Sequence, residues 1–147
     1  MIGSFQGEYR WLSNFWPAKV ILDGVEFPTV EHAYQAAKTL NPVARLAIKA
    51  QPTPGRAKRA AKMLSVREDW HAVSLGVMED LLRQKFQEPA LKALLLATGD
   101  EELIEGNTWG DRFWGVYGGQ GENHLGKLLM KIRQDLKLAL DGFTPLV

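Results

Sequence analysis

The sequence predicts an α+β protein in which helices dominate and a small β-hairpin lies near the N-terminus. Two short strand-like segments, Val20–Leu22 and Val25–Phe27, flank Asp23-Gly24, a dipeptide typical of a type I′ hairpin turn. Most of the later chain has apolar residues at helical spacing, interrupted by Asn-Pro, Thr-Pro and Gly signals. A chain of 147 residues can bury about two thirds of its unfolded surface. We therefore expect one domain over residues 1–147, with a loose tail over residues 141–147.

The composition excludes several kinds of site. The chain has no cysteine, so disulfides and thiolate zinc sites are excluded, and His32, His71 and His124 lack the spacing of a metal motif. We expect a site that uses neither metal nor cofactor. The first ten residues do not resemble a signal peptide, and no apolar run approaches the 18 or so residues that cross a bilayer. These features predict a soluble, cytoplasmic protein without a membrane partner.

Positive charge is concentrated in one part of the chain. No acidic residue falls between His32 and Arg67, and this span carries Lys38, Arg45, Lys49, Arg56, Lys58, Arg59, Lys62 and Arg67. A block of one sign favours a partner that bears phosphate, because surfaces that serve only solubility usually mix charges. A solvated basic face is the alternative that the sequence leaves open.

Helix signals follow the hairpin in order. We expect helices from Thr29 to Lys38, from Pro42 toward Ala50, after Thr53-Pro54, from a Ser65–Glu68 capping box to just before Glu88-Pro89, and from Pro89 to Ala97. The capping-box helix should be the longest. Leu103-Ile104 suggests a short strand, and Asn123 should cap a final helix.

The helix from Thr29 to Lys38 carries the most chemistry. Thr29 is a suitable N-cap, and a buried face is predicted at positions 30, 33, 34 and 37. Glu31, Gln35 and Lys38 form a second line, and Glu31 and Lys38 lie within roughly 20° of one another around the helix axis. The line can be a surface stripe or the edge of a site.

Polar residues among aromatic ones suggest a pocket in two further places. Ser13 and Asn14 interrupt an aromatic run that includes Phe15, which is typical of a pocket wall and equally of a buried turn. Residues 106–126 combine glycines, which let backbone approach a ligand, with aromatic rings that can stack. Arg56, in the first turn of its predicted helix, would suit a phosphate. Trp70 can be a ring platform or a packed core residue.

The ordered motifs resemble the NADAR family, which includes the YbiA-type N-glycosidases. They are Leu12-Ser13-Asn14-Phe15, Asp23-Gly24, FPTVEHAYQAAK from Phe27 to Lys38, Gly55-Arg56, Trp70, Lys85-Phe86, LLLATG from Leu94, Phe113-Trp114-Gly115 and GENHLGKLLMKIR from Gly121. The resemblance covers about residues 4–136 and implies a compact, helix-dominated YbiA-like fold. It also implies a hydrolase that cleaves an N-glycosidic bond at a ribose C1.

The resemblance implies two substrate classes. One comprises the phosphoribosylaminopyrimidine intermediates of riboflavin synthesis, whose hydrolysis releases ribose 5-phosphate. The other is ADP-ribosylated guanine in nucleic acid. We favour the first, with a small phosphorylated riboside as the partner. A non-catalytic module that binds ADP-ribose or NAD, and a simple nucleic-acid binder, are alternatives of another class. The oligomeric state stays open.

The resemblance also assigns roles to residues. Glu31 is the expected general acid/base or electrostatic stabiliser, although the first helical turn favours its ionised form. Lys38 is expected either to bind ribose or phosphate or to form a Schiff base at C1. The substrate-binding set is Asn14, Phe15, Gln35, Arg56, Trp70, Asp111, Trp114, Gly115, Asn123 and Gly126. Within it, Trp114 and Trp70 would sandwich the base, and Asp111 is a second carboxylate or a turn aspartate. His32 is expected to be structural.

Overall fold

The computed structural model describes residues 1–142, which form two compact units. The middle unit is Asn14–Lys85, and the terminal unit joins Met1–Ser13 to the chain from Phe86 onward. The single-domain organisation stays a prediction. The expected loose tail falls, from residue 143 on, outside the described residues. No helix among residues 1–142 has the length and apolar character needed to cross a membrane.

The middle unit begins with the predicted hairpin. Strands β1 (Pro17–Leu22) and β2 (Val25–Thr29) are antiparallel, with Val20 opposite Phe27 and Leu22 opposite Val25. Asp23 and Gly24 have φ values of 48° and 79°, as a type I′ turn requires, so the predicted turn is confirmed. The side-chain amide of Gln84 pairs with both backbone groups of Ile21, at 2.7 and 2.8 Å, and so covers part of the β1 edge.

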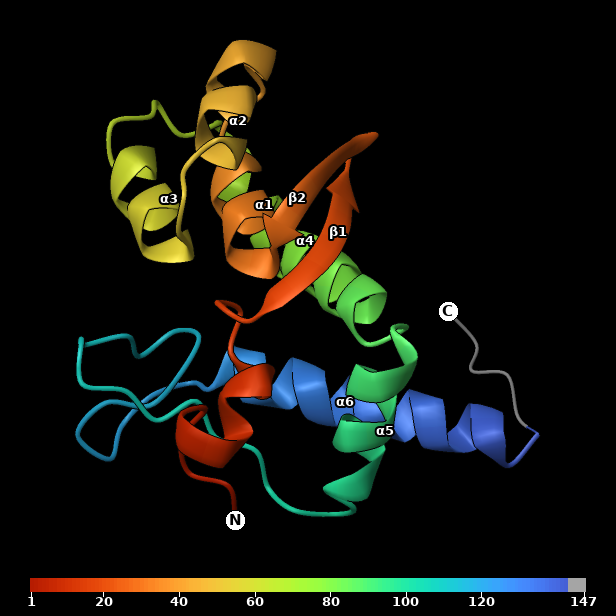
Figure 1. Cartoon of the computed structure of the whole chain (residues 1–147). Coiled ribbons are helices and arrows are strands. Elements are labelled where there is room, and N and C mark those ends of the chain that lie inside the picture. Colours follow the sequence, from red (N-terminus) through yellow and green to blue (C-terminus); the bar gives the residue numbers. More distant parts are fainter. Residues whose placement is uncertain (143–147) are drawn as a thin grey trace. The chain divides into compact units, whose positions relative to one another are not determined.

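Four helices complete the middle unit. They are α1 (Val30–Ala36), α2 (Pro42–Lys49), α3 (Pro54–Ala61) and α4 (Trp70–Lys85). The side chains of Thr29, Asn41 and Thr53 cap the first three by accepting backbone N–H groups, as expected. Helix α1 contacts both strands and the other three helices (Figure 1). All seven of its residues are buried, which makes α1 the centre of this unit.

The predicted start of α4 was wrong. The Ser65–Glu68 segment does not form a capping box, and the helix begins only at Trp70. A tertiary hydrogen bond keeps residues 65–68 outside the helix, because the Arg67 N–H donates to the Lys38 carbonyl at 2.8 Å. The Arg67 guanidinium pairs with Asp69, with one contact of 2.6 Å. Helix α1 also ends at Ala36, so Lys38 lies in the turn that follows it.

The terminal unit contains a short 3-10 helix η1 (Gly7–Leu12), α5 (Pro89–Ala97) and α6 (His124–Leu140). With 17 residues, α6 rather than α4 is the longest helix of the described chain. In place of the expected strand at Leu103-Ile104, the structure has a single parallel bridge between Ile2 and Leu103. Leu95, Leu103, Leu129 and Ile132 are buried in the core of this unit.

His32 has the structural role expected of it. The Thr29 hydroxyl accepts the His32 N–H at 3.0 Å and lies 2.7 Å from Nδ1, while Nε2 lies 2.9 Å from the Gln51 carbonyl. A neutral ring with its proton on Nε2 satisfies both contacts, since Nδ1 then accepts and Nε2 donates. The ring therefore links the start of α1 to the connection between α2 and α3.

Replacing Thr29 with valine should destabilise the protein more than the same change at Thr53. Both variants lose an N-cap, worth about 1 kcal/mol. Only Thr29→Val also leaves the buried His32 Nδ1 without its partner, and this loss costs a further amount of about 1–3 kcal/mol. Urea unfolding of the two variants measures the difference, and equal losses would contradict the role given to the Thr29–His32 contact.

Candidate active site

The predicted site residues are distributed over both units. The middle unit contains Asn14, Phe15, Glu31, Gln35, Lys38, Arg56 and Trp70, and the terminal unit contains Asp111, Trp114, Gly115, Asn123 and Gly126.

Glu31 is a buried carboxylate in the first turn of α1. Its side chain is 7% exposed, and its Oε1 accepts a hydrogen bond of 2.8 Å from Gln35 Nε2. Its own backbone N–H donates to the Asn14 carbonyl at 3.1 Å. Because Glu31 and Gln35 are both buried, the surface-stripe interpretation of this line was wrong. Buried carboxylates are rare unless they are paired, and they are frequent at functional sites.

Lys38 supplies an amine whose protonation is perturbed. Its Nζ lies 5.5 Å from the centre of the Tyr34 ring, and the side chain is only partly accessible. Burial lowers the pKa of Lys38, the charge of Glu31 opposes this effect, and the charge of Lys58 adds to it. A lowered pKa increases the fraction of neutral amine, the form that can attack a carbon centre.

Two buried acceptor atoms lack partners beside these groups. Asn14 Oδ1 and Gln35 Oε1 accept no hydrogen bond from any described residue. The Asn14 amide nitrogen donates instead to Met78 Sδ, at 3.5 Å. An unsatisfied buried acceptor costs about 1–3 kcal/mol, so each such atom calls for an explanation. A ligand that presents N–H or O–H donors would satisfy both.

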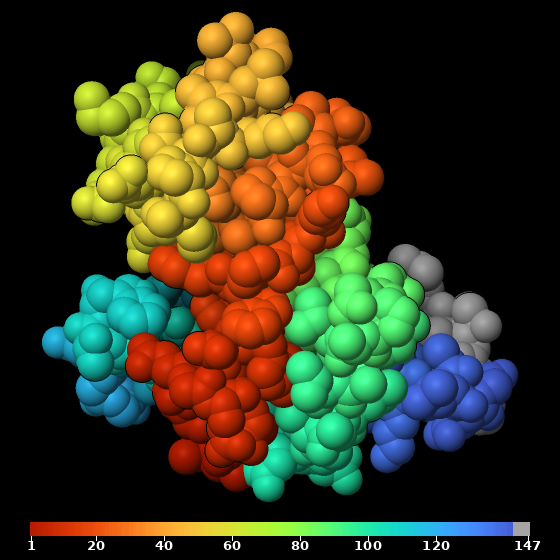
Figure 2. Space-filling model, viewed as in Figure 1, coloured from red at the N-terminus to blue at the C-terminus, as the bar shows by residue number. Residues whose placement is uncertain are grey.

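Rings and cations surround this part of the middle unit. The Trp70 ring lies 5.2 Å from Tyr34, centre to centre, and a Cβ at Gly55 would lie 3.9 Å from the Phe15 ring. Arg56 is exposed at the first turn of α3, and Figure 2 shows α2 and α3 (gold and yellow) at the surface of the unit. The sequence interpretation left Lys58 and Tyr34 out of the site. The Tyr34-to-Lys38 spacing of four residues was the signal available for Tyr34.

Asp111 and Trp114 make contacts within the terminal unit. Asp111 Oδ1 accepts the backbone N–H groups of Phe113 and Trp114, at 3.0 and 2.9 Å. These are the contacts of a turn aspartate. The Trp114 ring packs edge-on against Phe113, with 4.9 Å between the ring centres. Stacking of a base by Trp114 stays a prediction, as does a second carboxylate at Asp111.

Asn123 and two glycines make close contacts within the terminal unit. Asn123 precedes α6 with a φ of 54°, but it does not cap the helix with its side chain, so that expectation was wrong. Its amide instead joins Leu103 and Glu105, because Nδ2 donates to the Leu103 carbonyl and Oδ1 accepts the Glu105 N–H, both at 3.0 Å. A Cβ at Gly126 would lie 2.1 Å from the Leu103 oxygen, and one at Gly115 would lie 1.9 Å from Glu105 Oε2. The absence of a Cβ at these glycines lets another segment of the protein approach closely. Contact of either glycine with substrate stays a prediction.

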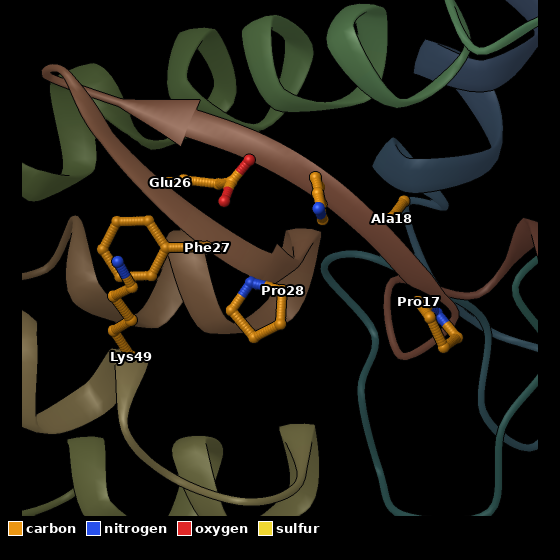
Figure 3. A pocket seen from close by; sticks show the side chains of 7 residues that line it. Pro17, Ala18, Glu26, Phe27, Pro28 and Lys49 are labelled. Atoms are coloured by element: carbon orange, nitrogen blue, oxygen red, sulfur yellow. The ribbon is translucent and has the colours of Figure 1, made fainter.

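A surface groove of about 570 Å³ also lies on the middle unit (Figure 3). The two strands of the hairpin line it, together with Lys49 of α2, and it includes neither Glu31 nor Lys38. Among residues 1–142, no group of three His, Asp or Glu side chains is placed to hold a metal ion.

The relatives of this small α+β protein are named N-glycosidases, which places it in the class of hydrolases that act on N-glycosyl compounds. The NADAR domain profile matches residues 3–137, and the chain belongs to the NADAR family. It is 42% identical over 141 residues to the N-glycosidase YbiA of Escherichia coli K12, an alignment that covers 92% of this chain and 86% of that protein. The NMR structure of E. coli YbiA matches with a TM-score of 0.79 and 39% identity, over 98% of this chain and 86% of the other.

A more distant relative is a longer protein. A riboflavin biosynthesis protein of Vibrio vulnificus is 36% identical over 139 residues, which are 88% of this chain and 36% of that protein. The family, the YbiA-like fold and the enzyme class expected from the sequence are confirmed by these comparisons.

Lys85, the last residue of α4, is a second amine with altered protonation. It is 1% exposed, and burial lowers its pKa to about 7. An unfolded lysine titrates near 10.4, so between about pH 7 and pH 10 the unfolded chain binds a proton that the folded chain does not. The free energy of unfolding should therefore increase with pH across this window, by up to about 1.4 kcal/mol per pH unit. Below pH 7 both states are charged and the slope disappears.

Lys85→Met should remove this slope, so that its free energy of unfolding relative to wild type falls as the pH rises from about 7 to 10. Urea unfolding at several pH values, taken as the difference between wild type and variant, isolates the contribution of Lys85. Lys62→Met, at an exposed position, is the matched control and should give a flat difference. Parallel pH profiles for wild type and Lys85→Met would contradict the assignment.

Proposed function

We propose that this protein hydrolyses the C–N bond between ribose C1 and a base or amine in a phosphorylated riboside. The substrates that we favour are phosphoribosylaminopyrimidine intermediates of riboflavin synthesis, with ribose 5-phosphate as a product. The observation that carries the proposal is the buried Glu31 carboxylate, electrostatically coupled to an amine, Lys38, whose pKa is lowered. The names of the YbiA relatives and of the Vibrio protein support the bond type and the substrate.

Glu31 acts on the charge that develops at C1. As the C–N bond breaks, its electron pair goes to the leaving amine and C1 gains oxocarbenium character. A carboxylate fixed beside this carbon stabilises the positive charge, and it can also transfer a proton. The basic residues of α2 and α3 favour a substrate that bears phosphate, with Arg56 as the proposed contact.

Lys38 offers a covalent route. Its neutral Nζ attacks C1, the bond to the base breaks, and the base leaves as an amine after it gains a proton. Opening of the sugar ring then gives a Schiff base between Nζ and C1, and water hydrolyses it to ribose 5-phosphate and free lysine. In the alternative route, water attacks C1 directly and the ammonium of Lys38 binds the ribose or its phosphate.

Glu31→Gln should abolish hydrolysis while the protein stays folded and still binds ribose 5-phosphate. We expect a loss of at least about 10²-fold in kcat, the usual contribution of an acid/base group. Purified protein is incubated separately with phosphoribosylaminopyrimidine and with ADP-ribosylated guanine, and the released base is measured by chromatography. Calorimetric titration with ribose 5-phosphate checks binding.

Glu26→Gln, at an exposed position on β2, is the matched control and should keep wild-type activity. Wild-type turnover by Glu31→Gln would refute the role of Glu31. Release of guanine-containing product without turnover of the pyrimidine substrate would refute our choice of substrate.

Borohydride added during turnover should trap a reduced sugar adduct on Lys38. Peptide mass spectrometry locates the adduct, which should be absent from Lys38→Arg and present in Lys62→Arg, a matched change at an exposed position. The covalent route is wrong if no adduct forms with the wild type while Lys38→Arg remains active.

A further inference from the structure

Gln35 lies one helical turn after Glu31 on α1 and is 3% exposed. Its Nε2 donates to Glu31 Oε1 at 2.8 Å. An ionised carboxylate only accepts hydrogen bonds, so the nitrogen of the Gln35 amide must face Glu31 and its oxygen must face away. That oxygen is buried and accepts no hydrogen bond from the described residues.

The orientation of Gln35 gives its two ends different tasks. The donated hydrogen bond restricts rotation of the Glu31 carboxylate and favours its ionised form over the protonated one. The remaining Oε1 can interact only with a donor that the described chain does not supply. Substrate supplies such donors, as the hydroxyls of the ribose or as the N–H groups of the amine that leaves.

The charged groups around α1 make the following contacts without Gln35. Lys38 follows the helix and is electrostatically coupled to Glu31, and Lys58 of α3 acts on Lys38. Arg45 of α2 binds Asp23 and the Thr39 carbonyl, and Arg67 binds Asp69. None of these cations changes when Gln35 is replaced, so a variant at this position reports on the amide alone.

We propose that Gln35 is a positioning residue that holds the Glu31 carboxylate with its amide nitrogen and binds a hydrogen-bond donor of the substrate with its amide oxygen. This inference rests on the hydrolase function proposed above. The alternative is an ordinary helical pair at positions i and i+4 that contributes to stability and has no part in the reaction.

Gln35→Met preserves the approximate shape of the side chain and removes both the donor and the acceptor. We expect kcat/KM to fall at least about tenfold and the acidic limb of its pH profile to move to higher pH by about one unit, since a hydrogen bond to a charged group is lost. Gln51→Met removes an amide that bonds only within its own turn, at Ala47, and should leave the profile unchanged. A less stable Gln35→Met with the wild-type pH profile would overturn the proposal.

Product binding tests the acceptor oxygen. If the donor is the ribose 2-hydroxyl, wild type should bind ribose 5-phosphate more tightly than 2-deoxyribose 5-phosphate, and Gln35→Met should lose this preference. If the donor is the leaving amine, the preference should survive in the variant and its affinity for the released aminopyrimidine should fall. No change in either affinity would refute the role of the oxygen.

Amide NMR tests the pairing of Gln35 with Glu31 without a turnover assay. The test uses wild type and Glu31→Gln, so it can be carried out even if Gln35→Met does not fold. The side-chain NH₂ resonances of Gln35 in wild type should shift as the carboxylate titrates, and this response should disappear in Glu31→Gln. A pH-independent resonance in wild type, or a response that persists in Glu31→Gln, would overturn the inference. Failure of the proposed function would show itself differently, as the absence of turnover by wild type on either substrate.

Discussion

The burial of α1 is the constraint on which the middle unit depends. The helix is enclosed by the hairpin and by three other helices, so every polar side chain on it must find a partner in the interior. Thr29 and His32 satisfy each other at its N-terminus, and Gln35 satisfies one oxygen of Glu31. Among residues 1–142, the amide oxygen of Gln35 has no hydrogen-bond partner, although it lies on the helix face that carries the carboxylate. A structural core would satisfy or remove such an atom, whereas a binding site requires one.

Local signals predicted the elements that depend on local chemistry. The Asp23-Gly24 turn, the caps of three helices and both ends of α5 follow from backbone preferences that neighbouring residues alone decide. The Ser65–Glu68 capping box failed because Arg67 binds Lys38 and Asp69 instead. Asn123 is similar, since its amide joins the Leu103 and Glu105 backbone, a contact between segments that are separated by irregular chain.

The candidate site was predictable in its residue types and not in its environment. Helical periodicity placed Glu31 and Gln35 on one line, but a line of polar residues has the same spacing on a surface and in a core. Only the packing of the hairpin and the other helices around α1 decides between these cases. The glycines at 115 and 126 show a similar ambiguity, because a residue that admits a ligand and one that admits the protein's own backbone look identical in sequence.

The electrostatics of Lys38 connect the two proposed chemical roles. Burial favours the neutral amine, and the charge of Glu31 favours the ammonium, so the two groups compete for the state of one proton. The Gln35 amide donates to Glu31 and favours its ionised form, so burial, rather than proton transfer to Glu31, increases the neutral fraction of Lys38. In the proposed reaction Lys38 would then be the nucleophile that displaces the departing amine, and the Glu31 carboxylate would stabilise the charge that develops at C1.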